Sequence, residues 1–312
     1  MIPIDWIETA ADRINEYIVH TPISHDEDLN LYIKWENKQI TGSFKVRGAI
    51  NRVLSLEPWE KKQCLVTASA GNHGQGVALA GRIVGTKVVV FVSDHAVQSK
   101  VDSMKELGAE IKFVKGGYGL SESSAIDYSI KNQATYISPY NDPQVIAGQG
   151  TIGLEILKDF QMNEPASWVV PVGGGGLISG LGIVKKANNC QGDLIGIQSE
   201  SSAFTHALFH GGKQEEIEDK PTLADGLSGP MQDGSITLPI IKNFVDNIFT
   251  VSEREIKHAI SFAWKKYHEK IEGSAAVSLA AILSGMVKPP ALIIITGGNI
   301  QKETHHQIID EY

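Results

Sequence analysis

The sequence has only two cysteines among its 312 residues. Cys64 and Cys190 lie far apart, and neither a Cys-x-x-Cys nor a His-Glu-x-x-His pattern occurs. Neither a disulfide framework nor a structural zinc site is therefore indicated. Because disulfides are rare in reducing compartments, this cysteine usage leads us to expect a cytoplasmic protein.

The chain also lacks blocks of basic residues and long apolar runs. Its formal net charge is −8, which argues against nucleic acid or an anionic membrane surface as the partner. No apolar stretch approaches membrane-spanning length, and the amphipathic N-terminus does not have the pattern of a secretory signal. The composition is otherwise that of a globular protein, 42% hydrophobic and 21% charged, and small molecules are the expected ligands.

Short strands and helices alternate along most of the chain. The periodicity predicts strands at residues 31–35, 64–67, 87–92, 111–114, 136–137, 168–172, 194–198, 248–251 and 292–295. It predicts helices at residues 46–56, 74–84, 97–107, 121–131, 149–160, 177–187 and 275–283, an N-terminal helix, and one that begins after the capping pair Ser252 and Glu255. Residues 215–234 have no clear periodicity, and we expect a loop there.

This alternation is typical of βαβ units in parallel sheets that are covered on both faces. The predicted fold class is α/β, with two doubly wound parallel-sheet domains that face each other across a cleft. We expect residues 1–64 and 144–312 to form a large domain and residues 65–143 to form a small inserted α/β domain.

Lys45 lies where a glycine turn meets the start of a predicted helix. The macrodipole is positive at a helix N-terminus, so a lysine there tends toward a lower pKa and a free amine, which can attack a carbonyl carbon. Taken alone, a solvated surface lysine is the commoner explanation. The functional hypothesis therefore depends on further motifs.

The loop that begins at Ser69 leaves a strand and enters a helix through small residues. Backbone amides at such a place can bind a carboxylate or a phosphate, and the side chain of Asn72 adds a donor. The simpler alternative is an ordinary turn in which Asn72 caps the helix.

A run of four glycines, Gly173, Gly174, Gly175 and Gly176, lies between another strand and helix. Their backbone amides can close on phosphate oxygens, because no side chain intervenes and glycine tolerates positive φ. The run also partly matches a dinucleotide fingerprint, with Glu200 near the place of a ribose-binding acid. That dehydrogenase alternative leaves the Lys45 and Asn72 motifs without a role.

Thr296 follows the predicted strand 292–295. Ligands of open α/β sheets collect at the carboxyl ends of the strands, where the Ser69 loop and the glycine run also lie. Thr296 could alternatively cap a helix in the tail. The convergence of four motifs at strand ends nevertheless favours one pocket, and its groups suit pyridoxal 5'-phosphate.

The sequence resembles the threonine/serine dehydratases (threonine ammonia-lyases) of the fold type II, tryptophan-synthase-β-like, pyridoxal-phosphate family. The resemblance spans nearly the whole chain in the same order and is carried by residues 42–49, 69–76, 145–151, 173–176, 224–226 and 296–299. We expect no C-terminal regulatory domain of the kind that feedback-controlled members have. The implied reaction is elimination of water from L-threonine or L-serine, which yields a 2-oxo acid and ammonia.

The resemblance also implies roles for single residues. Lys45 would carry the cofactor covalently and, once free, act as the catalytic base. The other cofactor-binding residues would be Phe44, Asn72 at the 3-hydroxyl, Gly173, Gly174, Gly175 and Gly176 at the phosphate, and Thr296 at the ring nitrogen. The substrate-binding residues would be Ser69, Ala70, Gly71, Asn72, His73 and Tyr140.

Several alternatives remain open at this level: serine racemase, hydroxyaspartate dehydratase, a β-replacement synthase of the same fold, and an inactive amino-acid sensor. Ala70 occupies the position of the serine that racemases use as a second acid/base, which favours elimination. Relatives bind a monovalent or divalent cation near the residue that matches Glu200, but Thr205 stands where racemases carry a neighbouring aspartate. A homodimer or homotetramer is expected.

Overall fold

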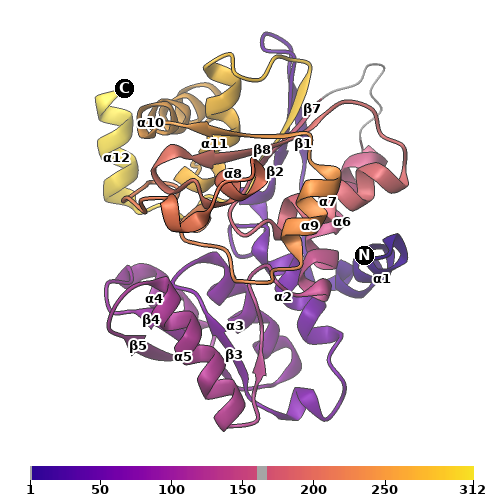
Figure 1. Ribbon diagram of the computed structural model, residues 1–312, viewed down its shortest axis with the longest axis vertical. Helices are drawn as coiled ribbons and strands as arrows, with labels where there is room; N and C mark the ends of the chain where they lie inside the picture. The colour runs from indigo at the N-terminus through magenta and orange to yellow at the C-terminus, as the bar shows by residue number, and fades with distance from the viewer. Residues whose placement is uncertain (1, 160–166) are drawn as a thin grey trace.

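Two β-sheets organise the chain (Figure 1). The computed structural model describes residues 2–159 and 167–312. The large sheet has the strand order β1-β2-β10-β7-β8-β9, and the small sheet has the order β5-β4-β3-β6. In Figure 1 the small sheet and its helices α4 and α5 form the lower part of the molecule, and the large sheet lies above them.

The large sheet is parallel except at one edge. It consists of β1 (Ile23–Asp26), β2 (Leu31–Trp35), β7 (Ser167–Pro171), β8 (Leu194–Ser199), β9 (Asn247–Val251) and β10 (Ala291–Ile295), and only β1 runs antiparallel to its neighbour. The small sheet is parallel throughout and consists of β3 (Leu65–Ala68), β4 (Val88–Ser93), β5 (Glu110–Val114) and β6 (Thr135–Tyr136).

Twelve α-helices accompany these strands within the described residues. They are α1 (Ile4–Ile14), α2 (Lys45–Leu54), α3 (Asn72–Val84), α4 (Gln98–Glu106), α5 (Tyr118–Lys131), α6 (Pro143–Asp159), α7 (Gly176–Ala187), α8 (Phe204–Phe209), α9 (Thr237–Phe244), α10 (Glu253–Phe262), α11 (Gly273–Leu283) and α12 (Lys302–Glu311). Among the described helices, none combines the length and the apolar character needed to cross a lipid bilayer.

The predicted α/β fold class with two parallel sheets is confirmed. The strand β1 was not expected, because only one of its four residues, Asp26, is buried and its sequence has no apolar alternation. The predicted helix 149–160 begins earlier, at Pro143, and Phe160 lies outside the described residues. Between residues 214 and 234 the structure has only the short 3-10 turns η5 (Gln214–Glu216) and η6 (Asp225–Leu227), in agreement with the expected loop.

Helix α2 lies at the junction of the two sheets. It packs against α3 beside the small sheet and against α6 beside the large one. Its apolar residues Val46, Ile50 and Val53 share one hydrophobic cluster with Leu65 and Val88 of the small sheet. The first residue of α2 is therefore held at the cleft by contacts from both sides. The expected domain boundaries at residues 64 and 144 stay a prediction.

Candidate active site

Lys45 is the first residue of α2, and its amine enters a cavity between the two sheets. Nζ donates a hydrogen bond to the carbonyl of Pro139 at 3.2 Å and lies 5.2 Å from the centroid of the Phe44 ring. Burial lowers the pKa of Lys45 to about 8, against the opposing attraction of the Glu272 carboxylate. About a tenth of this lysine is consequently free amine at pH 7, far more than for an ordinary lysine.

The turn before Lys45 docks on the segment that follows β10. The Phe44 amide donates to the carbonyl of Thr296 at 3.0 Å, and the Gly298 amide donates to the carbonyl of Gly42 at 3.0 Å. Ser43 and Gly297 form an isolated antiparallel bridge between these two bonds. The first and last of the four sequence motifs are thus joined directly through their backbones, although Phe44 and Thr296 lie far apart in the sequence.

A buried network of charged side chains holds α2 in place. The guanidinium of Arg47 pairs with Glu36 at 2.8 Å and with Glu155 at 2.6 Å, and Lys34 reaches the second oxygen of Glu155 at 2.6 Å. Arg47 and Glu36 are wholly buried, so their charges depend on one another. Because Arg47 follows Lys45 by two residues, the network holds the start of the helix in place.

The loop from Ser69 to His73 enters the N-terminus of α3. The Gly71 amide donates to Ser69 Oγ at 3.2 Å. No side chain caps the N-terminus of α3, so its first-turn amides have no partners inside the helix. The imidazole of His73 is buried, and its Nε2 pairs with the carbonyl of Ile137 at 3.1 Å. Burial, together with repulsion from Lys45, lowers the pKa of His73 to about 3, so that this ring is neutral.

The glycine loop leads from β7 into α7, and its shape requires glycine. An added Cβ would lie 2.4 Å from the Tyr140 ring at Gly174 and 2.3 Å from Ile241 at Gly175, and Gly175 also has a φ of +84°. At Gly176 it would lie 3.1 Å from Tyr140, and at Gly173 3.0 Å from the backbone of residue 227. Side chains at these positions would therefore clash with their neighbours, and glycine lets the loop pack closely before the N-terminus of α7, where an anion is favoured.

Two hydroxyl groups orient the peptide planes of this loop. Thr205 Oγ1 donates to the carbonyl of Gly173 at 2.6 Å, and Thr237 Oγ1 donates to the carbonyl of Gly174 at 2.7 Å. With their carbonyls tied to threonines, the amides are free to face an anion at the start of α7. Thr205 therefore supports the glycine loop in this chain.

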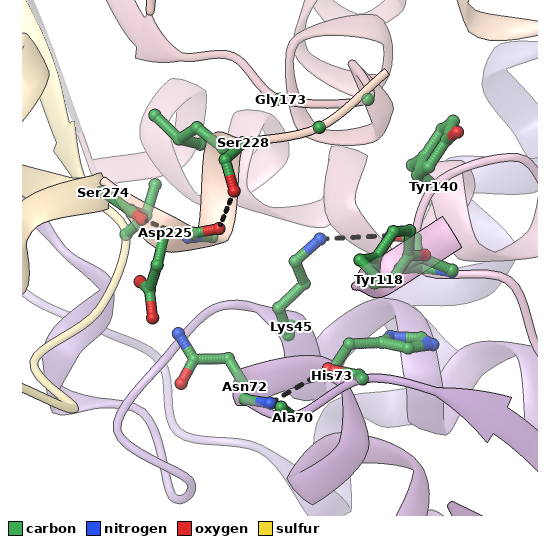
Figure 2. A pocket seen from close by; sticks show the side chains of 18 of the residues that line it. Lys45, Ala70, Asn72, His73, Tyr118, Tyr140, Gly173, Asp225, Ser228 and Ser274 are labelled. Carbon is green, nitrogen blue, oxygen red and sulfur yellow. Dashed lines mark hydrogen bonds between the residues drawn. The ribbon is translucent and has the colours of Figure 1, made fainter. Parts of the chain in front are cut away.

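These motifs line one cavity of about 360 Å³, a volume suited to a small organic ligand. Every residue that the sequence analysis assigned to cofactor or substrate lines it: Phe44, Lys45, Ser69, Ala70, Gly71, Asn72, His73, Tyr140, Gly173, Gly174, Gly175, Gly176 and Thr296. Figure 2 shows the Lys45 amine near its centre, with Asn72, Asp225 and Tyr140 around it. Glu200 is exposed in the turn η4 (Glu200–Ser202) and does not line this cavity.

Sequence reasoning missed several residues of the cavity. Lys100, Tyr118, Asp225, Glu272 and Ser274 also line it. Lys100 Nζ donates to Asp225 Oδ2 at 2.7 Å, which links α4 beside the small sheet to η6 beside the large one. Residues 224–226 are among those that carry the family resemblance. No local sequence pattern, however, distinguishes Lys100 or Glu272 from charged residues on the surface.

Glu272 is a buried carboxylate close to the amine of Lys45. Burial raises the pKa of Glu272 to about 7, and the Asp225 carboxylate adds to this rise, whereas Lys100 and a hydrogen bond from Asn72 oppose it. The Asn72 Nδ2 atom donates to Glu272 Oε1 at 2.7 Å. The lining of the cavity thus includes the amines of Lys45 and Lys100 and the carboxyl groups of Asp225 and Glu272, in addition to the uncharged loops.

The expected cation site has no cluster to match it in the described parts of the chain. Among those residues, no group of three or more histidine, cysteine or acidic side chains is arranged to hold a metal ion. The cation near Glu200 stays a prediction.

Residues 14–297 match the family model for the pyridoxal-phosphate dependent enzymes. The L-threonine ammonia-lyase of Thermotoga maritima is 39% identical, in an alignment that covers all of this chain and 79% of that protein. The catabolic L-threonine dehydratase of Escherichia coli K12 is 37% identical, with 98% and 96% covered. Among solved structures, serine racemase from Dictyostelium discoideum superimposes with a TM-score of 0.86 at 35% identity, over 96% of this chain and 99% of that one.

Proposed function

Since the chain belongs to the family of pyridoxal-phosphate dependent enzymes, we propose that it is a threonine/serine ammonia-lyase. It removes water from L-threonine or L-serine and releases a 2-oxo acid and ammonia. The two relatives named as threonine lyases match nearly the full chain at 37–39% identity, which supports this substrate class. Family membership also leaves the nicotinamide-dependent alternative without support.

The residues of the cavity fit pyridoxal 5'-phosphate. The loop of residues 173–176, in which any added Cβ would crowd its neighbours, lies at the N-terminus of α7, and this backbone suits a phosphate group. Lys45 supplies an amine of lowered pKa, and Asn72 supplies a side-chain donor. Thr296, buried directly after β10, would supply a hydroxyl for the ring nitrogen.

When bound, the cofactor supplies an electron sink that stabilises negative charge on the substrate Cα. Lys45 acts as the general base, and its Nζ accepts the proton from Cα. Its pKa of about 8 suits this role, because a base works best when its pKa lies near the working pH. The hydrogen bond to Pro139 and the contact with Phe44 orient the amine.

The loop from Ser69 to Asn72 holds the substrate carboxylate. The unpaired amides at the start of α3 carry the positive end of the helix dipole, which favours an anion. Tyr140 closes the opposite side of the cavity, and its hydroxyl is anchored by the amide of Gln232 at 2.7 Å. An aromatic wall at this point suits the methyl group of threonine.

The single observation that carries the proposal is that Lys45, the Ser69 loop and the glycine loop line one cavity. These are a base, a carboxylate site and a phosphate site. Water lost from the substrate in the elimination is regained when the resulting enamine or imine is hydrolysed. The net products are therefore the 2-oxo acid and ammonia.

A panel of β-hydroxy amino acids tests the proposal. Purified protein loaded with pyridoxal phosphate should release ammonia and 2-oxo acid in equal amounts from threonine or serine. Lys45→Ala should lose at least 100-fold in rate, because removal of a general base typically costs about that factor or more. Cofactor binding without any turnover would identify an amino-acid sensor and reject the lyase.

Serine racemase is the second candidate, because a racemase structure matches this chain at 35% identity. Racemisation requires a second acid/base on the face of the substrate opposite Lys45. Ala70 has no exchangeable proton, and Ser69 Oγ lies against the backbone of its own loop, where it accepts a hydrogen bond from the Gly71 amide. We expect chiral analysis of unreacted serine to find far less D-serine than pyruvate, and D-serine at a comparable rate would favour the racemase.

Other features of the predicted enzyme are also proposals. A homodimer or homotetramer would appear in light scattering coupled to gel filtration. A cytoplasmic location is in keeping with Cys64 and Cys190, which are both free thiols. A cation bound near Glu200 would change the thermal unfolding temperature when a chelator is added, or when sodium replaces potassium.

A further inference from the structure

Three side chains from distant parts of the chain form a hydrogen-bonded series beside Lys45. Asn299 Nδ2 donates to the carbonyl of Thr41 at 2.8 Å and to Asn72 Oδ1 at 2.7 Å. Asn72 Nδ2 in turn donates to Glu272 Oε1 at 2.7 Å. Asn72 begins α3 beside the small sheet, whereas Glu272 precedes α11 and Asn299 follows β10 beside the large sheet.

The direction of every bond in this series is determined by chemistry. The Thr41 carbonyl can only accept, so Asn299 must face it with its NH₂ group, and the same group then donates to Asn72. An ionised carboxylate can also only accept, so Asn72 must turn its nitrogen toward Glu272. A protonated Glu272 still offers a carbonyl oxygen, so the orientation is the same on both sides of its pKa.

We propose that Glu272 and Asn299 are positioning residues that lock the Asn72 amide so that it presents a donor to the cavity. Asn72 Nδ2 has two N–H bonds, and Glu272 takes one of them. Figure 2 shows the Asn72 nitrogen on the side of the cavity that holds Lys45 and Asp225. The second N–H is therefore available to an acceptor in the cavity, and the Asn72 oxygen is withdrawn from it.

A fixed donor selects the charge state of the group that it meets. It favours an ionised oxygen over a neutral hydroxyl, because a hydrogen bond to the charged form stabilises that form. This inference rests on the proposed function, in which Asn72 meets the 3-hydroxyl of pyridoxal phosphate. The lock would keep that hydroxyl ionised, whereas an Asn72 amide free to rotate could face it with its oxygen.

Gly297 and Gly42 leave room for this arrangement. An added Cβ at Gly297 would lie 2.4 Å from Glu272 Oε1, and at Gly42 it would lie 2.6 Å from Asn299 Oδ1. Gly42 has a φ of +69°, which favours glycine on its own account. Both glycines belong to motifs of the sequence analysis. The turns that bring Lys45 and Thr296 together therefore also leave space for the side chains of Glu272 and Asn299.

The test compares Glu272→Leu with Glu272→Gln. Leucine removes the acceptor, whereas glutamine keeps an acceptor oxygen for the Asn72 nitrogen, whose orientation Asn299 still fixes. For each protein, the dissociation constant of pyridoxal phosphate is measured together with the ratio of the visible to the near-ultraviolet absorbance of bound cofactor, across neutral pH. The ratio reports ionisation of the cofactor, which a merely structural residue would not change.

Glu272→Leu should weaken cofactor binding about tenfold and shift absorbance toward the near-ultraviolet, as expected for one hydrogen bond of about 1.4 kcal/mol. Glu272→Gln should stay within about twofold of wild type in binding and keep the visible band. Equal losses in both variants would show that the charge of Glu272 matters and not its acceptor, and the proposal would be wrong. Unchanged spectra in Glu272→Leu would also overturn it.

Two further variants complete the design. Glu253→Gln is the matched control, because Glu253 also accepts several hydrogen bonds, from Ser199, Thr222 and Leu223, but does not line the cavity. It should leave the absorbance ratio unchanged.

If Glu272→Leu does not fold, Asn299→Ala breaks the other side of the lock and should shift the spectrum in the same direction. A wild-type protein that binds no cofactor would reject the proposed function itself, whereas wild-type spectra retained in the variants would reject only the lock.

Discussion

Lys45 has a chemical character that its surroundings create. An ordinary lysine has a pKa near 10.5, so only about 0.3% of it is free amine at pH 8. Burial brings the pKa of Lys45 to about 8, where roughly half of it is free amine. The carboxyl group of Glu272 limits this fall, because it favours the ammonium form. At the scale of one residue, burial therefore makes the nucleophile.

We predict that the rate of carbamylation of Lys45 by cyanate in cofactor-free protein rises with a midpoint near pH 8. Mass spectrometry of digests taken at a series of pH values measures this midpoint, which does not depend on how accessible the lysine is. Lys87 is the internal control, because its hydrogen bond with Glu110 raises its pKa above the ordinary value. A common midpoint for the two lysines would contradict the effect of burial on Lys45.

The sequence predicted the residues of the site where several of them stand together, and it missed single residues such as Lys100 and Glu272. Gly173 to Gly176 and the turn before Lys45 are short runs whose backbone conformation is itself the signal. Glu272 is one acid in an otherwise ordinary stretch. Its role arises because α11 begins opposite α3, and this apposition depends on tertiary packing that no local pattern encodes.

At the scale of elements, α2 is positioned by charges as well as by apolar contacts. Arg47 lies on the buried side of the helix and forms hydrogen bonds with both Glu36 and Glu155. These two acids come from η2 (Glu36–Lys38), which follows β2, and from α6, so one side chain ties three elements together. The ion pairs hold the pKa of Glu155 below its usual range even though burial acts to raise it.

We predict that Arg47→Met destabilises the protein by about 3–5 kcal/mol, because it leaves buried carboxylates without their partner. Chemical denaturation measures the change. The control is Lys257→Met, which breaks the exposed pair with Glu311 and should leave the denaturation midpoint unchanged. An Arg47→Met midpoint equal to that of wild type would mean that the network contributes little to stability.

The elements differed in how well the sequence predicted them. Strand β2 was predicted with its observed bounds, and α7 differs by one residue, because buried parallel strands and their helices leave long apolar patterns. The six-residue α8 and the eight-residue α9 were not predicted. Both are too short to establish a helical period, and they form because their apolar residues pack against the large sheet and α7.

At the scale of the whole molecule, the cavity exists only where the two sheets meet. Alternation of strands and helices predicts each sheet, but it does not predict how one sheet faces the other. Polar contacts across the cleft help to fix how the two sheets face each other. Asn72 meets Glu272 and Asn299, and Lys100 meets Asp225, and in each case one partner comes from the side of the small sheet.

The pair of Lys100 and Asp225 lies at the wall of the cavity. The side chain of Lys100 is 16% exposed and that of Asp225 is 59% exposed. The pair therefore lies at the boundary between the cavity and solvent. Burial acts to lower the pKa of Lys100, but the attraction of Asp225 exceeds this effect and raises it overall. Lys100 therefore stays charged near neutral pH. This pair, called the clasp below, links α4 beside the small sheet to η6 beside the large sheet across the cleft.

We predict that Lys100→Met and Asp225→Asn each raise KM several-fold while kcat changes less, because each removes the same link across the cleft. The double variant should be no worse than either single variant, since both act through one interaction. Steady-state kinetics with threonine or serine gives these values. Added salt should raise KM of the wild type more than that of the variants, because screening weakens a pair that is partly exposed.

A charge swap separates the clasp from direct binding of substrate by Lys100. In Lys100→Glu with Asp225→Lys, opposite charges still face each other across the cleft, so a clasp predicts that KM returns toward the wild-type value. A lysine that binds the substrate carboxylate could not be replaced in this way, because the swap puts a negative charge in the same wall of the cavity and repels the substrate. Recovery of KM in the swapped variant, with each single charge reversal impaired, is the result that we expect. A swapped variant as impaired as Lys100→Glu alone would assign Lys100 to the substrate and reject the clasp.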